Sequence, residues 1–290
     1  MTDLLIICGP TASGKTAASI RMAKDHNGEI ICGDSMQVYK HMIIGTAAPT
    51  EEERSGIPHH LFGVIDPKHD FSLSQYVKLA HEKIAEVAGR GKLPIIVGGT
   101  GLYIDTVAQN IILLENSVSL ELRDKLQGQT TETLFERLEK IDPLYAEKIK
   151  DRRRVIRALE VYESAGLRPS EQKEKSRTGA KLYNTKYIGI TLPREELYDR
   201  INRRVDIMIE QGLIAEVERL LTYGMGRTAS QAIGYKEIIA HLRGECSEEE
   251  AIERIKINTR RYAKRQRTWF GRNERIEWIG DLEHRRILPK

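Results

Sequence analysis

One eight-residue stretch near the start of the chain constrains the fold more than any other: Gly9-Pro10-Thr11-Ala12-Ser13-Gly14-Lys15-Thr16. It matches the pattern G-x-x-x-x-G-K-[ST] of a phosphate-binding loop, or P-loop. An apolar run at residues 4–8 predicts a buried strand before it, and residues 16–24 predict a helix behind it. In this context, the N–H groups of the loop and the positive end of the helix point at one position and favour an anion there. The alternative is a chance match on a glycine-containing turn.

The residue types of the motif predict separate roles in holding a polyphosphate. Gly9 to Thr16 together would surround the phosphates. The Lys15 amine would reach the outer phosphate oxygens, and the Thr16 hydroxyl would bind Mg²⁺. The motif alone does not say which polyphosphate is bound.

Length and composition are those of an ordinary soluble protein. The chain has 290 residues, enough for one large domain or a core with an insertion. No apolar run approaches the roughly 20 residues of a membrane span, and neither a signal peptide nor a membrane location is expected. The three cysteines, Cys8, Cys32 and Cys246, form no C-x-x-C pair, so we expect no disulfide, no structural zinc and a cytoplasmic protein. Without an obvious exposed apolar stripe, a monomer is the default expectation.

The basic residues are concentrated in two places although the net charge is only +4. Arg152 to Arg154 with Arg157 form the first cluster. The segment 254–275 forms the second, with nine Lys or Arg and one acid, Glu274. Concentrated basic faces suit a nucleic acid better than a small metabolite. Solvated helix faces are the alternative.

The order of apolar runs predicts an α/β fold: a P-loop core with a mostly parallel sheet flanked by helices, plus a helical insertion. Predicted strands lie at 4–8, 29–32, the apolar part of 57–66, 92–97, 186–192 and, as a final edge strand, 275–279. Predicted helices of the core lie at 16–24, 75–89, 195–211 and 214–223, with a long basic helix that begins at a Ser247–Glu250 capping box.

No strong buried-strand pattern occurs between residues 116 and 186. Short helices are predicted at 120–126, 131–141 and 151–165, and an exposed loop at 169–185. The predicted organisation is therefore a core in two parts, 1–115 and 187–290, interrupted by a mostly helical insertion or lid at 116–186.

Two polar residues follow predicted strands and should lie on the same sheet edge as the motif, because ligands bind beyond the carboxyl ends of parallel strands. Asp34 could act as a base or bind a metal through water, or it could cap a helix. Thr100 follows Gly98-Gly99, which permit close backbone approach to a ligand, and it could also be a helix cap. An ordinary P-loop ATPase would carry an Asp at this second position. The neighbouring His59 and His60 should point opposite ways, so no metal site is predicted there.

Eight motifs occur in a fixed order: GPTASGKT, GDSMQVY, IGTAAP, HHL, PIIVGGTGLY, RRRVIRALEVY, QAIGYKE and TRRYAKRQRTW. Together they closely resemble the bacterial tRNA dimethylallyltransferase family, also called tRNA isopentenyltransferases, from about residue 4 to residue 269. Some members carry a C-terminal zinc finger, but no Cys/His set follows Trp278 here, and no zinc site is expected.

The resemblance implies transfer of a dimethylallyl group from dimethylallyl diphosphate to N6 of adenosine 37 in the tRNA anticodon stem-loop, with release of diphosphate. The motif would then hold a leaving group, with Lys15 and Mg²⁺ stabilising its charge. Asp34 matches the family's base, and Thr100 matches a residue that contacts the target nucleotide. The target base would have to leave its stack to reach the site. The implied tRNA contacts are Asp34, Ser35, Met36, Gln37, Thr100, Arg123, Arg153, Arg154, Arg157, Gln231, Gly234 and Tyr235.

Two other functions remain to be weighed. A P-loop nucleoside or small-molecule kinase would share the first motif and Asp34, but it explains neither the basic C-terminal helix nor the Gly-Gly-Thr strand exit. An RNA-binding module with a vestigial P-loop would not need the intact Lys15, Thr16 and Asp34.

Overall fold

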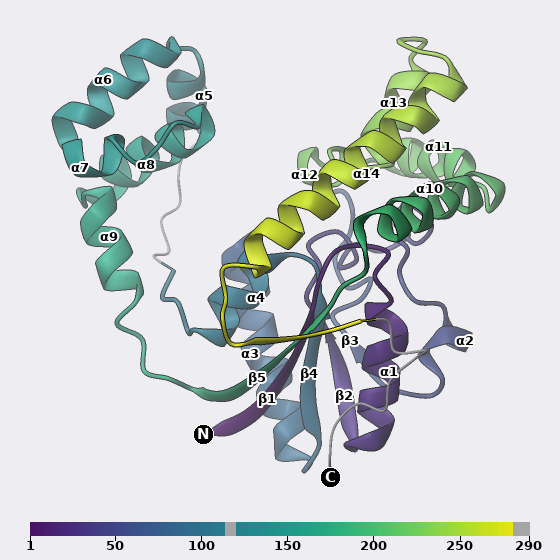
Figure 1. Cartoon of the computed structure of the whole chain (residues 1–290). Coiled ribbons are helices and arrows are strands. Elements are labelled where there is room, and N and C mark those ends of the chain that lie inside the picture. The colour runs from purple at the N-terminus through teal and green to yellow at the C-terminus, as the bar shows by residue number, and fades with distance from the viewer. Residues whose placement is uncertain (114–119, 281–290) are drawn as a thin grey trace. The chain divides into compact units, whose positions relative to one another are not determined.

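The computed structural model describes residues 1–113 and 120–280 and divides the chain into two compact units (Figure 1). Unit 1 comprises Met1–Ala108 with Leu182–Lys290, and unit 2 comprises Gln109–Lys181. These bounds lie a few residues before the expected limits of the insertion, 116–186. In the described part of the chain, no helix has the length and hydrophobicity that crossing a bilayer requires.

Unit 1 contains a six-stranded parallel sheet with the order β3-β2-β4-β1-β5-β6. Its strands are β1 (Thr2–Cys8), β2 (Gly28–Cys32), β3 (His59–His60), β4 (Leu93–Gly98), β5 (Tyr183–Ile190) and β6 (Ile276–Ile279). Cys8 at the end of β1 lies opposite Gly98 of β4 and Gly189 of β5. The central strands therefore end at one edge of the sheet, where a ligand site is expected. The predicted α/β fold is confirmed, including the edge strand β6.

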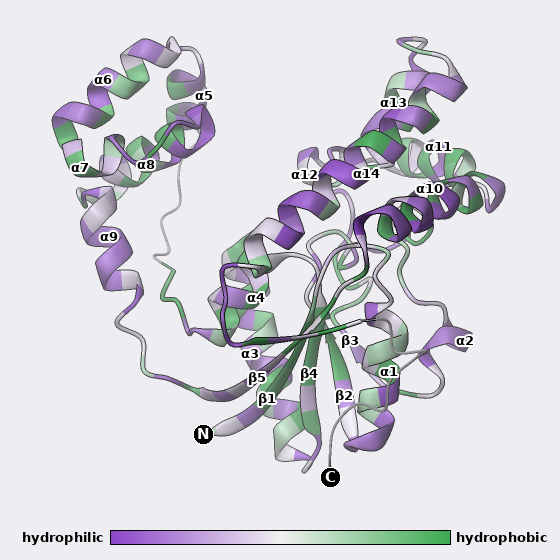
Figure 2. Cartoon of the chain, in the orientation of Figure 1, coloured by the Kyte–Doolittle hydropathy of each residue, from purple (hydrophilic) through white to green (hydrophobic). Residues whose placement is uncertain are grey.

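Helix α1 (Lys15–Asp25) packs on one face of this sheet, and α3 (Leu73–Gly89) and α4 (Gly101–Ala108) pack on the other. The other described helices of unit 1 are α2 (Glu51–Arg54), α10 (Arg194–Glu210), α11 (Leu213–Tyr223), α12 (Arg227–Ser230), α13 (Tyr235–Leu242) and α14 (Glu248–Phe270). Alternate residues of β1 enter two apolar clusters, one shared with α1 and the other with α3, α4 and the C-terminal helices. Figure 2 shows the hydrophobic strands between these layers. The predicted Ser247–Glu250 capping box is present at the start of α14.

The third strand was predicted wrongly in extent. Only His59 and His60 pair with β2, and the apolar residues after them leave the sheet. Leu61 and Gly63 have left-handed backbone conformations, with φ of 63° and 59°, which no strand accommodates. Ile65 instead forms an isolated bridge with Tyr39. β5 also begins at Tyr183, before the predicted residue 186.

Unit 2 is a small helical body around an apolar cluster that includes Leu126, Leu134 and Leu159. Its helices are α5 (Leu120–Gln127), α6 (Thr131–Ile141), α7 (Pro143–Ala146), α8 (Arg152–Ala165) and α9 (Pro169–Ser176). The prediction of an exposed loop at 169–185 is wrong, because α9 occupies its first part. Pro169 provides a favoured first helical residue, and the Asp142 carboxylate accepts a hydrogen bond from the Ser170 N–H at 2.8 Å.

Candidate active site

The P-loop motif forms a tight turn between β1 and α1, and its glycines are required by this geometry. Gly9 has φ of 142°, and a Cβ on it would lie 2.2 Å from the Ile190 carbonyl oxygen at the end of β5. Gly14 precedes α1 with φ of 92°, and Ala12 between them is also left-handed, with φ of 62°. The loop is thus folded tightly against the sheet edge, with the N-terminus of α1 at its end.

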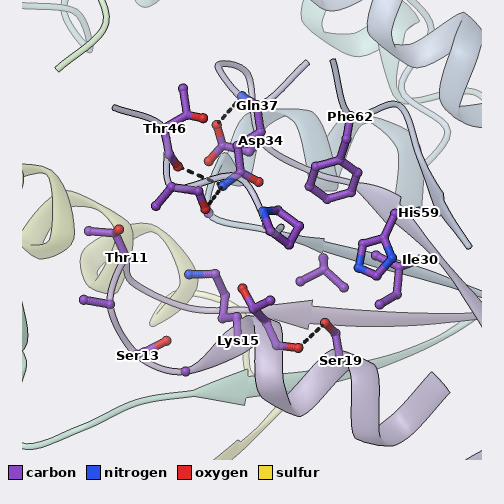
Figure 3. Close-up of a pocket in the computed structure, with 18 of the residues that line it drawn as sticks. Thr11, Ser13, Lys15, Ser19, Ile30, Asp34, Gln37, Thr46, His59 and Phe62 are labelled. Atoms are coloured by element: carbon purple, nitrogen blue, oxygen red, sulfur yellow. Dashed lines mark hydrogen bonds between the residues drawn. The ribbon is translucent and has the colours of Figure 1, made fainter. Parts of the chain in front are cut away.

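A cavity of about 300 Å³ lies beside this loop, and we call it the loop cavity. Thr11 to Thr16 line one part of it, with Asp34 on the opposite side, while Phe62, His59 and Ile30 line the far end (Figure 3). It is a polar pocket with one apolar end.

The loop cavity carries unbalanced positive charge. The Lys15 amine donates to the Pro10 carbonyl at 2.6 Å. Burial, with a further contribution from the nearby Arg204 guanidinium, lowers the pKa of Lys15 to about 8. Burial also lowers the pKa of Arg204. The Ser13 hydroxyl is buried without a hydrogen-bond partner. Two partly buried cations and a buried, unsatisfied hydroxyl are the features that an anion in this cavity would stabilise.

A second cavity of about 310 Å³ adjoins the first, and we call it the adjoining cavity. Six residues line both: Thr11, Ala12, Asp34, Thr46, Ala47 and Arg204. Most of the rest of its lining comes from residues 231–234, α10 and α14, including Tyr262 and Arg265. Ser35, Met36, Gly45 and Lys236 complete it. Asp34 and Arg204 are therefore the charged side chains at the junction of the two cavities.

Asp34 does not cap a helix, because a turn follows β2 at this point. Its Oδ1 accepts hydrogen bonds from the Met36 N–H at 2.8 Å and the Gln37 N–H at 3.4 Å. Ser35 and Met36 line the adjoining cavity, and Gln37 lines the loop cavity. The segment predicted to contact tRNA is thus a turn organised by the Asp34 carboxylate.

Thr100 anchors this turn and lines neither cavity. Its hydroxyl accepts a hydrogen bond from the Ser35 N–H at 3.1 Å and donates to the Ser35 hydroxyl at 3.4 Å. The glycines around it serve protein packing. A Cβ on Gly98 would lie 2.0 Å from the Gly33 carbonyl oxygen, and one on Gly101 would lie 2.2 Å from the Trp269 ring.

The predicted tRNA contacts at 231–235 fall into two groups. Gln231 and Gly234 line the adjoining cavity. Tyr235 is fully buried, and its hydroxyl donates to Glu216 at 2.6 Å. Tyr235 therefore supports the cavity wall from behind.

The basic cluster of unit 2 also divides by geometry. Arg123 pairs with the buried Glu160 through two hydrogen bonds of 2.7 and 3.3 Å, and Arg157 pairs with it at 3.1 Å. Arg153 and Arg154 are exposed, and Arg153 forms a long ion pair of 3.8 Å with Asp151. The last two are the side chains of the cluster best placed to meet an external anion.

The protein side chains at this site offer too few oxygen ligands to hold Mg²⁺ by themselves, so the phosphate groups of a substrate would have to supply others. In the described residues there is no group of three or more His, Cys, Asp or Glu side chains that could hold a metal. Thr16 and Asp34 both line the loop cavity and offer a hydroxyl and a carboxylate oxygen. Mg²⁺ commonly takes few protein ligands and completes its shell with phosphate oxygens and water.

Two residues of this site were not predicted. Arg204 on α10 lies in a run of charged residues that gives no signal of burial. Gln266 on α14 accepts from the Thr11 N–H at 2.8 Å and donates to the Gly99 carbonyl at 3.0 Å. Its position in the otherwise mostly apolar stripe with Ile255 and Trp269 was the available sequence signal.

Comparison with known proteins identifies close relatives over nearly the whole chain. Residues 37–274 match the family described as IPP transferase, and residues 2–61 match isopentenyl transferase. The chain is similar to the tRNA dimethylallyltransferase of Acetivibrio thermocellus, with 49% identity over 98% of this chain and 93% of the relative. That of Carboxydothermus hydrogenoformans is 51% identical over 95% of this chain and 91% of its own length.

Solved structures give the same result. The full-length tRNA isopentenylpyrophosphate transferase of Bacillus halodurans matches with a TM-score of 0.74 and 44% identity, covering 97% of this chain and 90% of that one. A eukaryotic dimethylallyltransferase described as acting on tRNA matches with a TM-score of 0.85 and 32% identity, covering 98% of this chain and 75% of that one.

Proposed function

Because this chain belongs to the IPP transferase family, we propose that it transfers a dimethylallyl group from dimethylallyl diphosphate to N6 of adenosine 37 in a tRNA anticodon loop. The observation that carries the proposal is the junction of two cavities at Asp34 and Arg204. One cavity has the charge and the loop for a diphosphate, and the other has room for a nucleotide. The reacting carbon and nitrogen would meet at the shared wall.

On this proposal the loop cavity holds the leaving group. Lys15 and Arg204 compensate the negative charge that grows on diphosphate as the bond between C1 and oxygen breaks, and the Ser13 hydroxyl gains a hydrogen-bond acceptor. Mg²⁺, when bound through Thr16 and the diphosphate oxygens, would neutralise further charge. Because Lys15 is partly buried, its interaction with diphosphate is stronger than it would be in bulk water.

Asp34 would take the proton of the target amine. The lone pair of N6 is delocalised into the adenine ring, so a carboxylate base nearby favours formation of the new bond between N6 and C1. The electron pair of the broken bond leaves with diphosphate, and the N6 proton passes to an Asp34 oxygen. The turn that Asp34 makes with Met36 and Gln37 fixes the direction of its carboxylate.

The tRNA would be held outside the two cavities by exposed basic groups, including Arg153 and Arg154 of unit 2. Contacts of Lys and Arg with phosphates give affinity and register without reading sequence. The target base would enter the adjoining cavity after leaving its stack in the loop, which costs about a few kcal/mol. We further propose a monomer, as no feature of the site requires a second copy.

Mass analysis of tRNA nucleosides after incubation with dimethylallyl diphosphate and Mg²⁺ tests the proposal. The expected product is adenosine that carries one added dimethylallyl group. Parallel reactions with labelled ATP test the kinase alternative, which finds no support among the relatives described above. Label transferred only from ATP would refute prenyl transfer.

A further inference from the structure

The buried carboxylate of Glu216 lies behind the wall that the two cavities share. Glu216 is on α11, is 3% exposed and lines neither cavity. Its oxygens accept hydrogen bonds from three consecutive backbone N–H groups: Ile43 at 3.1 Å, Ile44 at 2.9 Å and Gly45 at 3.1 Å. A fourth comes from the Tyr235 hydroxyl at 2.6 Å. These four hydrogen bonds satisfy the buried Glu216 carboxylate, so its role is to hold the neighbouring groups in place.

Tyr235 supports both the Glu216 carboxylate and the backbone that this carboxylate holds. Burial, with the adjacent Glu216 carboxylate, raises the pKa of Tyr235, so its hydroxyl remains a donor. A Cβ on Gly45 would lie 2.5 Å from the Tyr235 ring, so Gly45 is in direct contact with the ring face or edge. The backbone at 43–45 is thereby fixed by hydrogen bonds to Glu216 and by contact with the Tyr235 ring.

The segment 43–47 carries this restraint into the site. Two of its carbonyl groups are held by the site: the Gln37 amide donates to the Thr46 and Ala47 carbonyls at 2.9 and 3.2 Å. The Arg204 guanidinium is 3.4 Å from the Ala47 carbonyl. Thr46 and Ala47 line both cavities. Glu216 is thus connected, through one short backbone segment, to Arg204 and to the turn that holds Asp34.

We propose that Glu216 is a positioning residue for the transfer reaction, which sets the alignment of the two substrates at the shared wall through segment 43–47. The inference rests on the proposed function. A displacement of about 1 Å between reacting groups can cost roughly a hundredfold in rate. The motif loop meets this chain of contacts through Arg204, which is 3.4 Å from the Thr11 hydroxyl, whereas Lys15 and Ser13 lie outside it. Diphosphate binding should therefore depend on Glu216 less than the transfer rate does.

The test compares Glu216→Gln with Glu218→Gln, an exposed carboxylate on the same helix. In Glu216→Gln, one carboxylate oxygen is replaced by an NH₂ group, which is a donor and cannot accept the hydrogen bonds that the oxygen accepted. We expect kcat to fall about tenfold or more, with a smaller change, about threefold or less, in inhibition by pyrophosphate. Amide hydrogen exchange at Ile43, Ile44 and Gly45 should accelerate only in Glu216→Gln.

Tyr235→Phe removes one of the four hydrogen bonds and retains the ring, so it serves if Glu216→Gln does not fold. We expect its kcat to fall about threefold, and the double variant to be no worse than Glu216→Gln. Unchanged kcat in a folded variant, unchanged exchange at 43–45, or parallel loss of kcat and pyrophosphate binding would overturn the inference. No transfer by the wild type and by Glu218→Gln would instead refute the proposed function itself.

Discussion

Gln266 and Thr11 are hydrogen bonded although 255 positions separate them in the chain. The Gln266 amide accepts from the Thr11 N–H and donates to the Gly99 carbonyl, and it fills the place where a Cβ on Gly99 would lie. The long basic helix α14 is therefore attached to the motif loop and to the end of β4 at one side chain. The N–H of Thr11 is also withheld from any phosphate in this arrangement.

Replacement Gln266→Met keeps the volume of this side chain and removes both hydrogen bonds. The unpaired Thr11 N–H and Gly99 carbonyl should cost about 1–3 kcal/mol of stability, measured by chemical denaturation. Pyrophosphate should bind more weakly because the motif loop loses its support. Gln211→Met, at the exposed end of α10, provides the control and should change neither quantity. Equal stability of the two variants would contradict the role of Gln266 in holding Thr11 and Gly99.

Binding of pyrophosphate should weaken as the pH rises through about 8. Burial, then the neighbouring Arg204 charge, lower the pKa of Lys15 to about 8, so the free protein loses this positive charge there. A bound anion favours protonated Lys15, and its affinity is therefore highest below this pH and falls above it. Isothermal titration from pH 6.5 to 9.5 measures the effect. Lys15→Arg keeps its charge over this range and should show a flatter profile; identical profiles would exclude Lys15 as the cause.

The replacement Asp34→Asn distinguishes the proposed role of Asp34 as a proton acceptor from its role in holding the turn. The Asn oxygen can still accept from the Met36 and Gln37 N–H groups, but the side chain can no longer take a proton. We expect kcat to fall by about 10² to 10⁴ with tRNA affinity retained. Single-turnover rates and gel-shift assays measure the two effects. Asp34→Ala should lose tRNA affinity as well, because the turn loses its acceptor, and full activity of Asp34→Asn would reject a base at this position.

The exposed pair Arg153 and Arg154 should contribute to tRNA affinity through phosphates. The double replacement by Ala should weaken tRNA binding and reduce the slope of log K against log salt by about one per lost phosphate contact. Binding of dimethylallyl diphosphate should not change. Lys173→Ala, an exposed cation on α9 of the same unit, is the control. A slope equal to that of wild type would place the phosphate contacts elsewhere.

Arg123 should matter first for the stability of unit 2. Burial alone would raise the pKa of Glu160, but hydrogen bonds from Arg123 and Arg157 outweigh it and lower this pKa. Arg123→Ala leaves the buried carboxylate with fewer partners, at a cost of about 1–3 kcal/mol at pH 7. Because the folded-state pKa is depressed, the contribution of Glu160 is present above its ordinary pKa and lost as the pH falls toward the folded value. Unfolding curves of both proteins should therefore converge under acidic conditions; a constant difference would contradict this account.

Local patterns were sufficient for much of the architecture. The apolar runs, the motif and the capping box depend on neighbouring residues, and β1, β2, β4, α1 and α14 follow from them. The prediction of the third strand was wrong in extent because the left-handed residues Leu61 and Gly63 turn the apolar run away from the sheet. The prediction of a loop at 169–185 missed α9 because a group that stabilises its start, the Asp142 carboxylate, lies 28 positions before Ser170 in the chain.

The sequence by itself determined that a P-loop sequence motif, a carboxylate at Asp34 after a strand, and concentrated basic segments occur in one α/β chain. These features are carried by short runs whose chemistry does not depend on distant contacts. Only the tertiary structure brought Arg204 into both cavities, placed Glu216 behind segment 43–47 and joined Gln266 to Thr11. Each of these relationships joins residues more than 100 positions apart, and a buried polar side chain is chosen by the donors and acceptors that the fold leaves unpaired around it.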